Sequence, residues 1–120
     1  MTGIAFDQPV RDIVARSGAQ SNCAGYAKIL IDVEPAELFE FVDADDKAST
    51  VGCDDALVGE CADAVRRGVV AELDRLGQGQ PPAVRVVLRR LFIHVVDAVP
   101  WRYEEVGRMA VAEAWRRRNK

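Results

Sequence analysis

The sequence is poor in the residues that most enzymes use for chemistry. It holds one histidine and three cysteines in 120 residues. The lone His94 has no Ser or Cys nucleophile at a recognisable spacing, so we predict no catalytic site. A Gly-rich phosphate loop is also missing, and we therefore expect neither GTP binding nor GTP hydrolysis. The expected protein is not an enzyme and needs no cofactor.

The three cysteines, Cys23, Cys53 and Cys61, show no Cys-x-x-Cys spacing. We interpret them as small apolar side chains or idle thiols in a reducing cytoplasm. The alternative is that Cys23 and Cys61 pair or bind a metal, but the sole histidine lies far along the chain. We predict no metal site.

Long apolar runs are absent as well. No run approaches the ~20 residues that span a bilayer. Residues 1–6 lack the basic and apolar regions of a secretory signal, so we expect a cytoplasmic protein away from membranes. Basic residues are not in excess, since the net charge is -3 and the pI is about 5.2. Any RNA contact therefore needs a local basic patch.

The composition is that of one folded domain. Hydrophobic residues make up 49% of the chain and charged residues 29%. A chain of this length can bury a core without help from disulfides or metals. We predict that residues 1–120 form a single domain.

Alternating apolar residues predict the strands of one sheet. Residues 26–34 place Ala27, Ile29 and Ile31 on one side, which is typical of a strand with one buried face. A short connection at Pro35 leads to a strand over residues 38–43, and this predicts a hairpin. Residues 4–15, interrupted by Pro9, suit an edge strand.

A further strand is expected over residues 84–96, and its parity changes on the way. The apolar residues at 84, 86 and 88 share one face, whereas those at 91, 93 and 95 fall on the other. One core can take both sets only if a bulge, twist or turn lies near Arg89 and Arg90.

Two segments show the apolar spacing of helices. The first is residues 56–76, which end at Gly77. The second is residues 100–118, which begin at Pro100, a residue favoured in the first helical turn. Its expected inner side carries Trp101, Val106, Met109, Ala110 and Ala114. The run 116–118 is Arg-Arg-Arg, and it either complements the helix C-terminus or contacts RNA.

Residues 43–55 collect five aspartates against a single lysine. A calcium loop is excluded, because Lys47 takes a ligand position and Ala48 stands where the turn needs glycine. We interpret the segment as a solvated acidic loop. Its last pair, Asp54 and Asp55, is expected to favour the positive N-terminus of the following helix.

Five segments carry a family resemblance: residues 24–35 (AGYAKILIDVEP), 39–43 (FEFVD), 59–69 (GECADAVRRGV), 94–97 (HVVD) and 107–114 (GRMAVAEA). In this order they resemble domain IV of translation elongation factor G and of the tetracycline ribosomal-protection proteins. Residues 4–6 are similar to the lead-in strand of that family. The resemblance covers nearly the whole chain.

The resemblance implies an α+β fold, in which a single sheet of about four strands carries two helices on one face. It also implies a left-handed β-α-β crossover, although such crossovers are right-handed in about 98% of proteins. In elongation factors this domain is a mechanical probe without chemistry of its own. Its tip, which corresponds here to residues 43–58 and 90–97, enters the decoding region of the ribosome.

The tip residues leave two functions open. In the first, the domain binds ribosome or RNA through Arg89, Arg90, His94 and Asp97. In the second, it is a repurposed protein-interaction module, in which Leu91, Phe92 and Ile93 form an apolar contact with a partner protein or a second copy. The acidic loop opposes the first function, since negative charge repels phosphates. The arginines and the histidine favour it.

Overall fold

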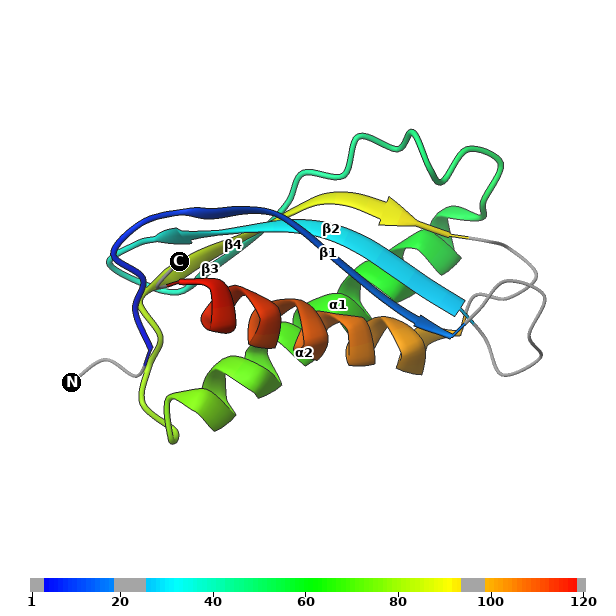
Figure 1. Cartoon of the computed structure of the whole chain (residues 1–120). Helices are drawn as coiled ribbons and strands as arrows, with labels where there is room; N and C mark the ends of the chain where they lie inside the picture. Colours follow the sequence, from blue (N-terminus) through cyan, green and yellow to red (C-terminus); the bar gives the residue numbers. More distant parts are fainter. Residues whose placement is uncertain (1–3, 19–25, 94–98, 119–120) are drawn as a thin grey trace.

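The computed structural model describes residues 4–18, 26–93 and 99–118. Four strands form one sheet in the order β1-β2-β4-β3. Both helices lie on the same face of this sheet, below it in Figure 1. The elements are β1 (Val10–Gly18), β2 (Tyr26–Pro35), β3 (Glu40–Asp43), α1 (Asp55–Leu76), β4 (Val84–Phe92) and α2 (Pro100–Arg117). The predicted α+β fold is confirmed.

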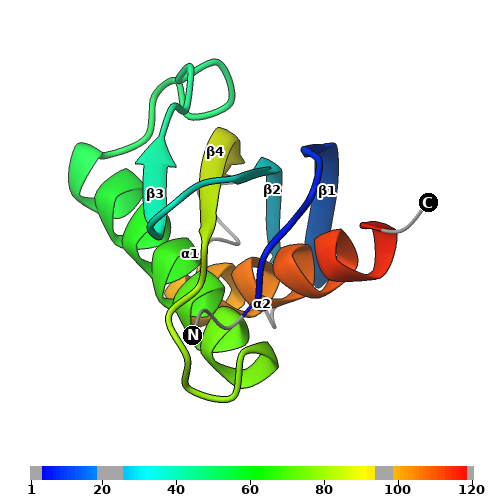
Figure 2. The same cartoon turned by 90° about the vertical axis from the view of Figure 1, so that its left-hand side faces the viewer.

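The sheet is mixed. β2 pairs antiparallel with both β1 and β4, whereas β3 pairs parallel with β4. In Figure 2, the chain runs away from the viewer along β3, returns through α1 below the sheet and enters β4 to the right of β3. This counterclockwise turn makes the β3–α1–β4 crossover left-handed, as the family resemblance implied.

The predicted hairpin between residues 26–34 and 38–43 is wrong. β4 lies between β2 and β3, and Pro35 is paired with Val84 at the last position of the β2–β4 ladder. The chain after β2 passes the end of β4, where the Ala36 amide donates to the Ala83 carbonyl at 3.2 Å. Period-two alternation shows which side chains are buried but does not identify the neighbouring strand.

The predicted irregularity near Arg89 and Arg90 is confirmed as a β-bulge. Leu30 is paired with Arg90 and Ile31 with Leu88, so Arg89 is an extra residue in β4. The bulge reverses the parity of the strand. As a result, Leu88 and Leu91 are both fully buried in the same core.

A second bulge lies in β1, opposite the same region of β2. Val10 is paired with Val33 and Ile13 with Ile31, which leaves one more residue on β1 than on β2. Asp12 in this bulge has a φ of 59°, a left-handed conformation that aspartate tolerates better than most residues.

Asp32 joins the two bulges. Its carboxylate is buried on β2 and accepts the Asp12 amide at 2.9 Å and the Arg89 guanidinium at 3.2 Å. Arg89 also donates to the Asp12 carboxylate at 2.5 Å. Hydrogen bonds to charged groups are stronger than neutral ones. The buried Asp32 carboxylate therefore holds both irregular strands in register.

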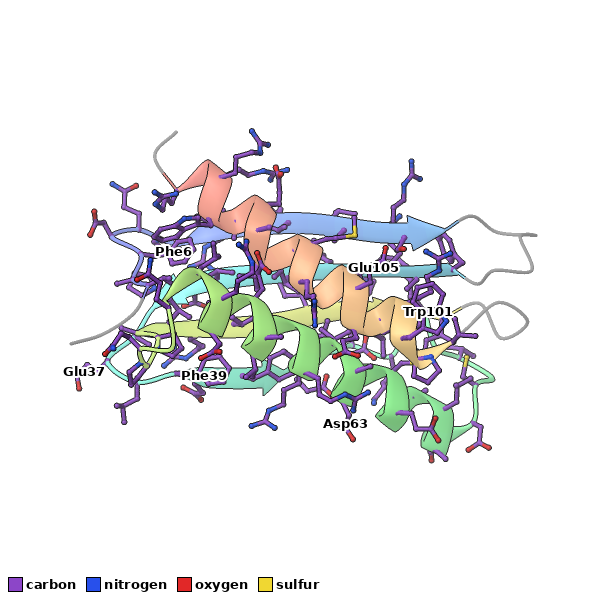
Figure 3. The ribbon with its side chains drawn as sticks, turned by 90° about the horizontal axis from the view of Figure 1, so that it is seen from below. Phe6, Glu37, Phe39, Asp63, Trp101 and Glu105 are labelled. Atoms are coloured by element: carbon purple, nitrogen blue, oxygen red, sulfur yellow. The ribbon has the colours of Figure 1, made fainter. Side chains whose placement is uncertain are left out.

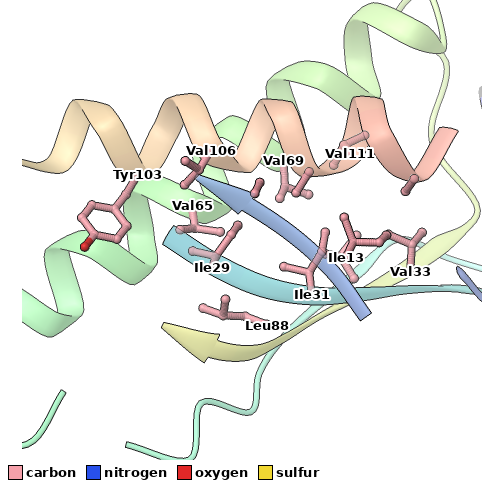
Figure 4. Packing of buried hydrophobic residues seen from close by; sticks show 14 of the residues in the cluster. Ile13, Ile29, Ile31, Val33, Val65, Val69, Leu88, Tyr103, Val106 and Val111 are labelled. Carbon is pink, nitrogen blue, oxygen red and sulfur yellow. The ribbon is translucent and has the colours of Figure 1, made fainter. Parts of the chain in front are cut away.

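The core fills the space between the sheet and the helices (Figure 4). The largest fully buried side chain is Tyr103 on α2, whose hydroxyl donates to the Phe92 carbonyl at 2.6 Å. The prediction that Trp101 and Met109 lie on the inner side of this helix is wrong, since Trp101 is 54% exposed and Met109 is 41% exposed. The buried stripe of α2 consists of Tyr103, Val106, Gly107, Ala110, Val111 and Ala114.

The two helices cross in direct backbone contact. Seen from below, they lie side by side across the sheet (Figure 3). A β-carbon on Gly68 of α1 would lie 1.9 Å from the Glu104 carbonyl oxygen, and one on Gly107 of α2 would lie 2.4 Å from that of Val65. Only glycine fits at either position. Neither helix is long and apolar enough to cross a membrane, and no other helix occurs in the described ranges.

We predict that Gly68→Ala lowers the free energy of unfolding by about 3 kcal/mol, because the new methyl group overlaps backbone that cannot rotate away. Gly59→Ala is the matched control in the same helix, since a β-carbon there meets nothing within 4 Å. That change should stabilise the protein by about 1 kcal/mol through helix propensity. Urea unfolding of both variants tests this, and equal effects would contradict the crossing.

Candidate functional site

Within the described residues, one face of the sheet carries no helix, and most of its side chains are at least partly exposed. Near the tip, Arg16 of β1 is paired with Lys28 of β2, and Lys28 with Phe92 of β4. All three lie on the uncovered face, because the residues next to them in each strand, among them Ala27 and Leu91, are buried under the helices. Arg90 lies on the same face, beside this row. We call Arg16, Lys28, Arg90 and Phe92 the tip surface.

The tip surface gathers cations around a half-buried aromatic ring. The Lys28 ammonium lies 4.7 Å from the centre of the Phe92 ring, and the Arg90 guanidinium lies 5.9 Å from it. Both distances fall within the range of cation–π attraction. Neither Arg16 nor Lys28 forms an ion pair with a carboxylate in the described part of the chain.

The two arginines predicted from the sequence differ in their roles. Arg89 is held by Asp12 and Asp32, and these hydrogen bonds raise its pKa. We therefore assign Arg89 to the bulges and not to ligand contact. Arg90 donates to Asp46 at 2.6 Å, a bond that lowers the pKa of the Asp46 carboxyl. The Asp46 carboxylate thus neutralises part of the charge that Arg90 brings to the tip surface.

The aspartates of the acidic loop mainly organise their own backbone. Asp43 accepts the Asp45 amide at 3.2 Å, and Asp46 accepts the Ala48 amide at 3.0 Å. Asp45 accepts the Leu91 amide of β4 at 3.0 Å. The expectation for the last pair is confirmed, because Asp54 caps α1 by accepting the Ala56 amide at 2.9 Å and Asp55 lies in the first turn.

The proposed apolar contact is corrected at one position. Leu91 is fully buried, because the bulge turns it toward the helices, and it cannot meet a partner. Phe92 and Ile93 are half-buried, and the Ile93 amide donates to the Ser49 carbonyl at 3.3 Å. The remaining candidates, His94 and Asp97, lie outside the described residues.

Two interior groups among the described residues have raised pKa values, and burial is the main cause in both. Burial raises the pKa of the Cys61 thiol to about 12. It also raises the pKa of Tyr103, whose hydroxyl is bonded to Phe92. Cys53 and Cys61 are free thiols. Residues 4–18, 26–93 and 99–118 contain no group of three or more His, Cys, Asp or Glu side chains placed to hold a metal ion.

Sequence reasoning missed two members of the tip surface, Arg16 and Lys28. Lys28 lies on the side of the predicted strand 26–34 opposite Ala27 and Ile29, but nothing in the alternation brings it to Arg16 or Phe92. That contact depends on the register between β1, β2 and β4, which includes two bulges. The available signal was the strand parity, which puts both cations on the face opposite Ala27.

We predict that Cys53 reacts with iodoacetamide in the native protein at about pH 8, whereas Cys61 reacts only after unfolding, because thiolate is the reactive species. Peptide mass spectrometry distinguishes the two. The raised pKa also makes the native state less stable in alkali. The contribution of Cys61 to stability is complete below about pH 8.5, its unfolded pKa, and falls as the pH rises toward 12. Equal labelling of both thiols would contradict the buried position.

Comparison with known proteins supports the fold. No family model matches the chain, and no curated protein matches it. Among 57 solved chains that match, one is the protein ttk003000868 of Thermus thermophilus, with a TM-score of 0.61 and 14% sequence identity. The match covers 95% of this chain and 18% of that protein. At this identity the likeness shows a shared fold.

Proposed function

We propose that this chain is a non-enzymatic, translation-factor-like domain that binds RNA or the ribosome through its tip surface. The resemblance to domain IV of elongation factor G suggests the class, and the left-handed crossover is consistent with it. The observation that carries the proposal is the Phe92 ring with Lys28 and Arg90 beside it on an uncovered sheet face.

Such a surface suits unpaired nucleotides. Bases stack on aromatic rings, and neighbouring cations attract the phosphates between them. Phe92 offers the ring, and the Tyr103 bond to its carbonyl fixes the backbone beneath it. Arg16 and Lys28 offer charges without carboxylate partners in the described part of the chain. This local patch answers the objection that the whole chain is acidic, because phosphate attraction acts over about one Debye length.

A second candidate function is protein interaction at the same end of the molecule. Val51 in the acidic loop is 84% exposed, and this loop is bonded to β4 through Ser49 and Ile93. Together with Phe92, these residues could bury apolar area against a protein partner or a second copy.

We predict that Phe92→Ala weakens binding of a single-stranded RNA about tenfold, through lost stacking. Lys28→Ala should weaken it as well and lower the salt slope by about one unit. Arg67→Ala, an exposed charge on α1, is the control and should change little. Fluorescence anisotropy and ribosome co-sedimentation measure these effects, with thermal melts to verify folding.

We also predict that Asp46→Asn tightens RNA binding, because it removes a negative charge and releases Arg90. A gain of affinity cannot arise from misfolding. If wild type and Asp46→Asn both fail to bind RNA, while Phe92→Asp abolishes a salt-insensitive association seen by analytical ultracentrifugation, the interaction module is the correct function.

A further inference from the structure

A basic groove lies at the end of the molecule opposite the tip surface. It is formed where the segment before β1 meets the last turn of α2, which lie together at the left of Figure 1. Its volume is about 380 Å³. Gln8, Pro9 and Val10 line one side, and four arginines complete the lining: Arg11, Arg116, Arg117 and Arg118.

These arginines exceed the acidic groups beside them. Glu113 accepts Arg116 through both carboxylate oxygens, at 2.9 and 2.5 Å, and Arg117 at 2.5 Å. Arg11 donates to Asp32 at 3.4 Å, lies 3.9 Å from the Glu34 carboxylate and remains 54% exposed. The two arginines hold the pKa of the Glu113 carboxyl at about 2, so it is ionised at neutral pH. Arg11 has its own carboxylate neighbours, but Glu113 balances only one of the three cations at residues 116–118.

Arg118 is the best positioned cation. Its guanidinium lies 3.4 Å from the centre of the Trp115 ring, and it also donates to the Trp115 carbonyl. The Trp115 ring in turn forms a T-shaped pair with the Phe6 ring, with centroids 5.6 Å apart. Arg118 has no carboxylate partner among the described residues. Because stacking already restricts this long side chain, it loses less conformational entropy when it binds a ligand.

We infer that this groove binds a run of closely spaced phosphate groups. Each guanidinium carries five N–H donors, and the bonds to Glu113 and Asp32 use only some of them. Arginine forks match phosphate oxygens in bidentate geometry. Several cations along an open groove favour a chain of phosphates over a single small anion. The chain is either the backbone of an RNA or inorganic polyphosphate. The inference is independent of the tip surface, which shares no residue with the groove.

The first experiment is calorimetric titration with inorganic tripolyphosphate. Arg118→Ala should weaken binding about tenfold, because the variant loses its hydrogen bonds to the charged ligand. Arg118→Lys, which keeps the charge but loses the fork and the stacking, should recover only part of the affinity. Arg66→Ala, an exposed arginine on α1, is the charge-matched control. Equal losses in Arg118→Ala and Arg66→Ala would show attraction without a site and overturn the inference.

Glu113→Gln provides a test that loss of folding cannot mimic. Removing the carboxylate frees the forks of Arg116 and Arg117 and should tighten tripolyphosphate binding about fivefold, the effect of one charge close by in a solvated site. Unchanged or weaker binding in this variant would overturn the inference.

Comparing different ligands shows whether the bound phosphates belong to RNA or to polyphosphate. Binding of both a single-stranded RNA and tripolyphosphate, with the same loss in Arg118→Ala, supports the site and shows that it accepts either chain. Binding of tripolyphosphate alone supports the site and assigns it to polyphosphate. Equal binding of polyglutamate would overturn the phosphate assignment. Phe92→Ala separates the two ends, since it should leave tripolyphosphate binding unchanged even if the tip surface fails to bind RNA.

Discussion

The arrangement of the domain depends on the contact between α1 and α2 at Gly68 and Gly107. A side chain at either position would overlap the carbonyl of the opposite helix, so the absence of side chains sets the distance between the helix axes. Both helices can then lie on the same face of a narrow sheet, as Figure 3 shows, while the other face stays open. Both glycines fall in segments that resemble elongation factor G, which gives this part of the resemblance a physical basis.

The open face combines regular and irregular parts. Next to the tip, regular strand pairing places Arg16 beside Lys28 and Lys28 beside the Phe92 ring. Further along, the strands on both sides of β2 bulge, and Asp32 holds them through Arg89 and the Asp12 amide. An arginine that sequence reasoning gave to a ligand therefore belongs to the sheet itself. The two groups of cations that we propose for ligand binding lie at opposite ends of the molecule.

The sequence predicted much of the fold because helices and strands leave local periodic signals. It located both helices, β2 and β4, and the parity change at residues 88–91 predicted the bulge. It failed where the answer depended on non-local pairing. The hairpin expected after Pro35 does not form, because β4 takes that edge of β2. Leu91 was predicted to contact a partner for a similar reason: its direction depends on the bulge in the pairing of β4 with β2, which turns it into the core.

The position of β3 has a consequence for the order of folding. Adjacent strands β1 and β2 form the one local pair among the described elements, and this hairpin can close early with little loss of chain entropy. β3 pairs only with β4, and the whole of α1 separates the two in sequence. A parallel pair of this kind raises the contact order and slows folding. We therefore expect a nucleus built from the hairpin and the crossing helices, with the β3 edge docking last.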